Sequence, residues 1–79
     1  MAGKYFVEKD YGNMPVQLYT EAELEERLGA TELLRQARRL GVGEVIPYVN
    51  LSGGPTHPTY LMRVTAREFR RIQKREGIA

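Results

Sequence analysis

The stretch T-E-A-E-L-E-E-R-L-G-A-T-E-L-L-R-Q-A-R-R-L-G, residues 20–41, decides how this chain folds, because its leucines change sides halfway along. Successive residues of a helix advance by about 100°. With Leu24 as the origin of one continuous helix, Leu28 falls at about 40° and Leu33 at about 180°. A single straight helix cannot bury both positions against one core. The stretch therefore predicts two short helices.

Capping residues locate the break between these helices. Gly29 suits the position just after a helix, and Thr31 suits the N-cap of the next one. Thr20 and Glu23 have the spacing of a capping box, in which each side chain accepts a hydrogen bond from the other residue's backbone N–H. We therefore expect helices over residues 21–28 and 32–40, with Gly41 directly after the second helix.

The segments on both sides of residues 20–41 favour β-strands. Residues 4–10 and 16–19 carry aromatic and β-branched side chains around a turn that contains glycine, asparagine and proline, which predicts an N-terminal hairpin. Residues 42–51 and 59–64 have strand composition as well, and Pro47 favours an edge strand or a bend. The segment between them, S-G-G-P-T-H-P, has the composition of a loop.

A second capping pair, Thr65 and Glu68, begins a last helix that extends to about residue 76. The predicted fold class is a small single α+β domain over residues 1–79, with the order β-β-α-α-β-β-α. It comprises a hairpin at 4–19, two short helices within 20–41, a hairpin at 42–64 and a C-terminal helix at 65–76.

The composition is that of a globular chain, with 42% hydrophobic and 28% charged residues. The net charge of +2 hides an asymmetry between the two parts of the chain. Residues 1–34 hold three basic and seven acidic side chains, a net −4, whereas residues 35–79 hold nine basic and three acidic ones, a net +6. Such a split is typical of proteins that bind a polyanion, although solvated helix faces produce it as well.

Basic side chains gather on one face of the last predicted helix. Its apolar stripe consists of Ala66, Phe69 and Ile72. Like charges at helical spacing repel each other by roughly 0.2–0.5 kcal/mol per pair, and phosphates lying opposite would relieve that repulsion. The cations opposite the stripe, at spacing i, i+3, i+4 and i+7, are Arg67, Arg70, Arg71 and Lys74.

The second predicted helix also separates apolar from basic side chains, with Leu33, Leu34 and Ala37 on its apolar face. Arginine can pair with guanine and glutamine with adenine in the major groove. The polar face therefore suits base edges as well as phosphates, although solvation, or a pair between Arg35 and Glu32, would also explain it. The candidate side chains on this face are Arg35, Gln36, Arg38 and Arg39.

Residues 20–31 resemble the first helix and turn of the excisionase and MerR-like winged helix-turn-helix families. The matching positions are Thr20, Glu23, Leu28, Gly29, Ala30 and Thr31, and the resemblance extends from Thr20 to Ile72. It implies a winged helix-turn-helix-like core preceded by the N-terminal hairpin. The second helix would enter the major groove with Thr31 near a phosphate, and the last helix would add phosphate contacts. The loop would be a wing, comprising Ser52, Gly53, Gly54 and His57.

These observations predict a small non-enzymatic DNA-binding protein, a regulator or architectural factor of the phage or mobile-element type. Duplex DNA is the expected partner, with a homodimer or cooperative filament on it. The alternative is a protein-binding module, such as an accessory or inhibitor protein that blocks a larger complex through its charged faces. A third hypothesis gives the aromatic residues a role in binding single strands, although core packing is their commoner role. Those residues are Tyr5, Phe6, Tyr48 and Tyr60.

The sequence offers little for catalysis or metal binding. His57 is the single histidine and there is no cysteine, so we predict no metal site, no cofactor and no enzymatic activity. No apolar run approaches the roughly 18 residues that a membrane span needs, and no signal-peptide pattern is present. We therefore expect a cytoplasmic protein that does not enter membranes.

Overall fold

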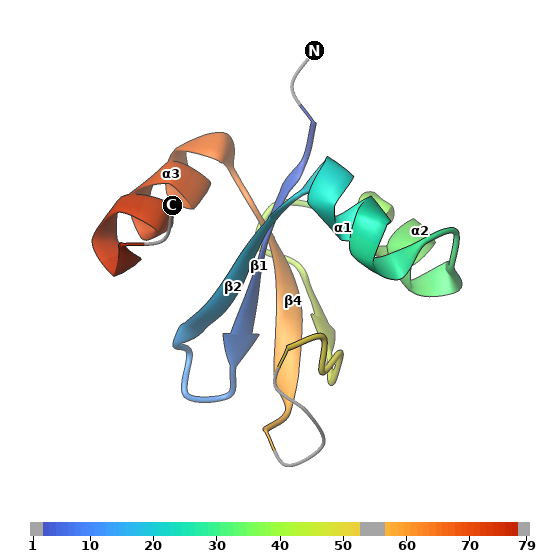
Figure 1. Ribbon diagram of the computed structural model, residues 1–79, viewed down its shortest axis with the longest axis horizontal. Helices are drawn as coiled ribbons and strands as arrows, with labels where there is room; N and C mark the ends of the chain where they lie inside the picture. The colour runs from blue at the N-terminus through green and yellow to red at the C-terminus, as the bar shows by residue number, and fades with distance from the viewer. Residues whose placement is uncertain (1–2, 53–56, 78–79) are drawn as a thin grey trace.

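A computed structural model describes residues 3–52 and 57–77 and contains the predicted order of elements (Figure 1). A four-stranded antiparallel sheet lies at the centre of these residues, with the strand order β2-β1-β4-β3. The elements are β1 (Tyr5–Asp10), β2 (Pro15–Thr20), α1 (Glu21–Leu28), α2 (Glu32–Arg39), β3 (Val45–Pro47), β4 (Thr59–Val64) and α3 (Ala66–Glu76). The α+β class and the N-terminal hairpin are confirmed.

The third strand is much shorter than predicted. Residues 42–51 were expected to be one strand, but only Val45–Pro47 pairs with β4. Pro47 has no N–H to donate, and the next residue, Tyr48, has a positive φ of 56°, which turns the chain away from the sheet. The prediction that Pro47 favours an edge strand is confirmed.

β4, the second strand of the predicted hairpin at 42–64, lies inside the sheet. β4 pairs with β3 on one side and with β1 on the other, where Val7 lies opposite Met62. The N-terminal hairpin and the second pair of strands therefore form one continuous sheet. Residues 53–56, which include the proposed wing residues Gly53 and Gly54, lie outside the described residues.

Helices cover both faces of this sheet, as Figure 1 shows, with α1 and α2 on one side and α3 on the other. The alternation along β1 explains this arrangement, because successive side chains of a strand point to opposite faces. Phe6 is fully buried under α1 and α2 with Leu24 and Leu34. The next residue, Val7, is fully buried under α3 with Ile72. Each face thus has its own apolar cluster.

The break within residues 20–41 is confirmed at Gly29. The capping box of α1 is complete, with the Glu23 amide 3.2 Å from Thr20 Oγ1 and the Thr20 amide 2.8 Å from Glu23 Oε1. Gly29 follows with φ 64° and ψ −163°, a backbone conformation that is essentially restricted to glycine. Thr31 then caps α2 by accepting from the Leu34 amide.

Replacement of Gly29 tests the two-helix interpretation through the sign of its effect. We expect Gly29→Ala to lower the free energy of unfolding by about 1–3 kcal/mol, because alanine is strained at this φ and ψ. An alanine Cβ would have open space around it, so the effect isolates the backbone. In one continuous helix the same change would stabilise the fold by about 1 kcal/mol. Urea denaturation measures the difference.

Gly77→Asn provides the matched control for this prediction. Gly77 caps α3 at φ 69° and ψ 21°, the left-handed region that asparagine tolerates. Asparagine at position 77 should therefore change stability by only a few tenths of a kcal/mol, whereas Gly29→Asn should be as harmful as Gly29→Ala. Equal effects at the two positions would contradict the assigned conformation of Gly29.

Two helix termini differ in detail from the predictions. α2 ends at Arg39, and the positive φ that follows it belongs to Gly43 rather than to Gly41. A side chain from the sheet stabilises this end, since Arg63 Nη1 donates to the Leu40 carbonyl at 2.8 Å. At the start of α3, Thr65 accepts from the Glu68 amide at 3.0 Å, but the Glu68 carboxylate lies 3.3 Å from Arg71 Nη1 instead of completing a capping box.

Candidate nucleic-acid interface

The outer face of α3 carries a row of exposed basic side chains. Thr65 fixes the start of this helix, and Phe69 and Ile72 bury its inner face on β1 and β2. Anchoring of the inner face forces the opposite side chains into solvent. Those exposed cations are Arg67, Arg70, Arg71, Lys74 and Arg75.

The cations of α3 are only partly neutralised. Arg71 lies 3.3 Å from Glu68, and Arg75 lies 3.4 Å from Glu76. Among residues 3–52 and 57–77, no acidic side chain lies within 4.0 Å of the other three cations, which are Arg67, Arg70 and Lys74. The outer face of α3 therefore keeps an uncompensated positive charge, which is the local requirement for binding an anion.

The arginines of α2 are in a different electrostatic environment, because each of them lies near a carboxylate. Arg35 Nε is 3.0 Å from Glu32 Oε1, and Arg39 Nη2 is 4.0 Å from Glu32 Oε2. The hydrogen bond and charge of Arg35 lower the pKa of Glu32. The intrahelical pair between Arg35 and Glu32, the alternative to DNA contacts for Arg35, is thus present.

Arg38 links α2 to α1. Its guanidinium lies 2.9 Å from Glu21 and 3.3 Å from Glu25, both on α1, and the Lys4 ammonium donates to its carbonyl. The pKa of Glu21 is lowered, first by the hydrogen bond from the Lys4 backbone N–H and then by Arg38. Arg38 therefore takes part in packing the two helices, a role that the helical spacing alone did not reveal.

The sheet separates the proposed contact residues into two groups. α2 lies on one face of the sheet, and Thr31 and Gln36 are exposed on it. Ser52 lies on the same side, because it forms hydrogen bonds with Tyr19 and Glu8. α3 lies on the opposite face. His57 is exposed and lines a hollow with Ser52 next to the β1–β2 turn. A single duplex lying flat on one face would not meet both groups.

A buried carboxylate was missed by the sequence analysis. Glu8 is fully buried, and its oxygens accept from the Thr59 hydroxyl at 2.6 Å, the Ser52 amide at 3.0 Å and the Tyr19 hydroxyl at 3.1 Å. Burial raises the pKa of Glu8, but these hydrogen bonds outweigh burial and leave the pKa below its ordinary value. The sequence contained a sign that Glu8 is buried. Glu8 stands two residues after Phe6, so its side chain points to the same face of β1.

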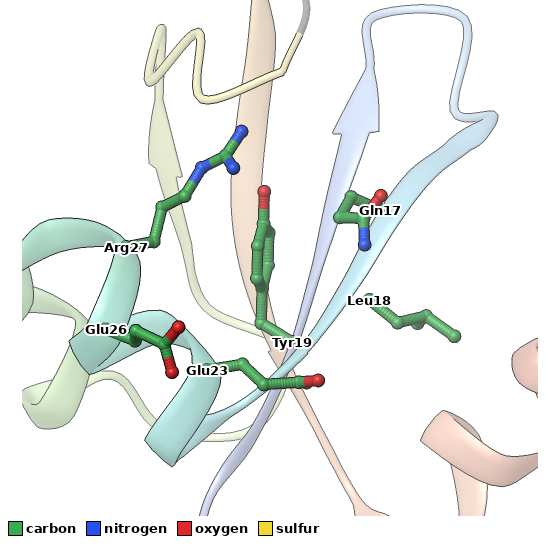
Figure 2. Close-up of a pocket in the computed structure, with 6 residues that line it drawn as sticks. All are labelled: Gln17, Leu18, Tyr19, Glu23, Glu26 and Arg27. Carbon is green, nitrogen blue, oxygen red and sulfur yellow. The ribbon is translucent and has the colours of Figure 1, made fainter. Parts of the chain in front are cut away.

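A hollow on the α1 face carries both charge signs, as Figure 2 shows. Its charged side chains come from α1, with Glu23 and Glu26 at one end and the Arg27 guanidinium pointing toward the other, and β2 contributes Tyr19. Arg27 donates to the Leu51 carbonyl at 3.0 Å, and Glu23 completes the capping box. The polar groups of this hollow thus largely serve the fold.

Comparison with models of protein families, with curated proteins and with solved structures finds no match to this chain. No helix in the described part of the chain is long and apolar enough to cross a membrane. Residues 3–52 and 57–77 also contain no cluster of three or more histidine, cysteine, aspartate or glutamate side chains that could hold a metal ion.

Proposed function

We propose that this chain is a small DNA-binding protein whose main phosphate-binding surface is the outer face of α3. The observation that carries the proposal is the row of Arg67, Arg70 and Lys74, which have no acidic partner among the described residues. Seven residues of helix span about 10 Å, so the row could follow about three successive phosphates of one strand. Contacts of this kind are independent of base sequence, as in an architectural or accessory DNA-binding protein.

Charge repulsion supports α3 over α2 as this surface. The arginines of α2 already lie beside Glu21, Glu25 and Glu32, so binding a phosphate there would displace or repel carboxylates. The uncompensated cations of α3 repel each other in the free protein, and a phosphate would remove that repulsion. A phosphate therefore gains more binding free energy at α3 than at α2.

The winged helix-turn-helix hypothesis remains a second mode of the same function. Arg35, Gln36 and Arg39 are exposed, and salt bridges as exposed as theirs contribute little stability, so DNA could exchange with Glu32 as their partner. In this mode α2 would enter the major groove and Arg35 and Arg39 would be the sensitive residues. Substitutions in the two helices distinguish the modes.

Salt titration of duplex binding tests the proposed function. Fluorescence anisotropy with a labelled duplex of random sequence should show binding at low salt. Engagement of all five cations of α3 would give a slope of log affinity against log salt of about −4.5. If the folded protein binds neither duplex nor single-stranded DNA at low salt, the proposal fails, and the charged faces are better explained as contacts to a protein partner.

A further inference from the structure

The sheet face that carries α3 is covered over only part of its area. α3 packs mainly on β1 and β2, with Val64 and Met62 of β4 at the edge of its cluster, and in the described part of the chain no helix covers β3 on this face. Cross-strand pairing places Val45 beside Met62 and Pro47 beside Tyr60 on this side. Met62 lines one shallow hollow that reaches Glu68 of α3 and another that reaches Tyr60, so an open apolar strip leads away from α3.

Three tyrosines form the far end of this strip. The ring of Tyr11 lies between those of Tyr48 and Tyr60, with centroid distances of 5.2 and 5.3 Å. Hydrogen bonds hold two of the rings, because Tyr11 Oη accepts from the Tyr48 amide at 3.3 Å and Tyr60 Oη donates to Asn13 at 2.6 Å. Tyr48 nevertheless remains 70% exposed and Tyr11 48% exposed. We call these three residues the tyrosine cluster.

The backbone at Tyr48 supports a role for the cluster beyond packing. Its φ of 56° is unfavourable for a large side chain, and such strain tends to occur at functional positions. The exposed ring gains little burial in return. Of the four aromatic residues in the single-strand hypothesis, Phe6 is fully buried and Tyr5 packs on Phe69, so only Tyr48 and Tyr60 remain available.

The charge on this face indicates what the tyrosine cluster binds. Lys9 pairs across the strands with Tyr60 and therefore lies beside it on the α3 side of the sheet. The Asp10 carboxylate is also near the rings, since burial and then its charge raise the pKa of Tyr60, but the Gly12 and Met14 amides donate hydrogen bonds to it. A cation such as Lys9 next to aromatic rings matches a polyanion that carries planar apolar groups. Unpaired nucleotides have this chemistry, whereas the bases of a duplex are already stacked on each other.

We propose that the tyrosine cluster stacks unpaired bases of a single-stranded nucleic acid whose phosphates contact Lys9 and the cations of α3. This inference rests on the proposed function and narrows it, since it makes single strands the preferred ligand. The proposal predicts that the chain binds an oligothymidylate more tightly than a duplex of the same length.

Variants at Tyr48 test the stacking directly. Tyr48→Leu keeps an apolar side chain but removes the ring, and it should weaken oligothymidylate binding about 10-fold, the usual effect of losing one stacked base. Tyr48→Phe keeps the ring and should stay within about twofold of the wild type, as should the exposed control Met14→Ala. The chain has five tyrosines and no tryptophan, so quenching of tyrosine fluorescence on binding reports the stacking.

The outcomes separate this inference from the proposed function. Unchanged strand affinity for Tyr48→Leu, or tighter binding of duplex than of single strand, overturns the stacking and leaves the proposed function intact. Absence of binding to either ligand at low salt overturns both. If sedimentation shows a dimer that Tyr48→Leu dissociates while strand affinity stays unchanged, a second copy of the chain covers the strip and the inference is wrong.

Discussion

Replacement of Glu8 with alanine is expected to lower the free energy of unfolding by about 3 kcal/mol, because buried donors would lose their acceptor. Glu8 accepts from Thr59, Ser52 and Tyr19, which come from β4, the segment after β3, and β2. A domain of this size has a total stability of only roughly 4–12 kcal/mol, so the loss would be a large part of it. Urea denaturation at pH 7 measures the effect.

The same carboxylate should make stability depend on pH. The pKa of Glu8 is lower in the folded protein than its ordinary value. The ionised carboxylate therefore makes its full contribution to the free energy of unfolding at any pH above the pKa of Glu8 in the unfolded chain. The contribution is lost as pH falls through the lower, folded pKa. Denaturation curves measured from pH 7 downward should therefore show a loss of stability below about pH 4.5. Glu8→Gln should be less stable than the wild type at pH 7 and should reduce this loss.

Glu26→Gln is the matched control for the Glu8 variants. Glu26 is exposed on α1 and has no hydrogen bond or salt bridge among the described residues, so its replacement removes the same charge without breaking the buried network. Glu26→Gln should remain within about 0.5 kcal/mol of the wild type at pH 7. Equal stability of Glu8→Ala and the wild type would show that the Glu8 hydrogen bonds do not hold the strands together.

Removal of two α3 cations is expected to have the largest effect on DNA binding. Each phosphate contact contributes about 0.9 to the exponent of the salt dependence. If the variant and the wild type bind equally at 1 M salt, where phosphate contacts are screened, the loss of two contacts should weaken binding at 0.1 M salt by about 1.8 logarithmic units. The variant would then bind roughly 60-fold more weakly than the wild type. Arg67→Ala combined with Arg70→Ala makes this change, and because neither side chain has an acidic partner among the described residues, the fold should be retained.

The control for this prediction is Arg35→Ala combined with Arg39→Ala. It removes two exposed arginines from α2, so the change in net charge is identical. Affinity for duplex should fall by no more than a few-fold if α3 carries the phosphate contacts. A large loss in the α2 variant together with normal binding by the α3 variant would instead support the winged helix-turn-helix mode.

Local features of the fold could be predicted from the sequence because they depend on neighbours. The angular positions of Leu24, Leu28 and Leu33 required a break, and the helix-ending glycine and the threonine N-cap located it. The basic face of α3 was equally clear, because its cations and apolar residues occupy opposite sides of one short helix.

Features that depend on pairing between distant segments could not be predicted in this way. Nothing local specifies that β4 lies between β1 and β3, or that α2 and α3 pack on opposite faces of the sheet. The link from Arg38 to Glu21 joins residues 17 positions apart, and the bond from Thr59 to Glu8 joins residues 51 apart. The tyrosine cluster likewise brings Tyr11 to Tyr48 and Tyr60 only through the sheet.

The most direct test of the central claim, that α3 binds phosphates, is the salt dependence of binding rather than affinity at one salt concentration. The slope of log affinity against log salt should become less steep by about 1.8 in the Arg67→Ala, Arg70→Ala variant, because two phosphate contacts are lost. The slope of the Arg35→Ala, Arg39→Ala variant should equal that of the wild type. An unchanged slope in the α3 variant, with the protein folded, would contradict the claim.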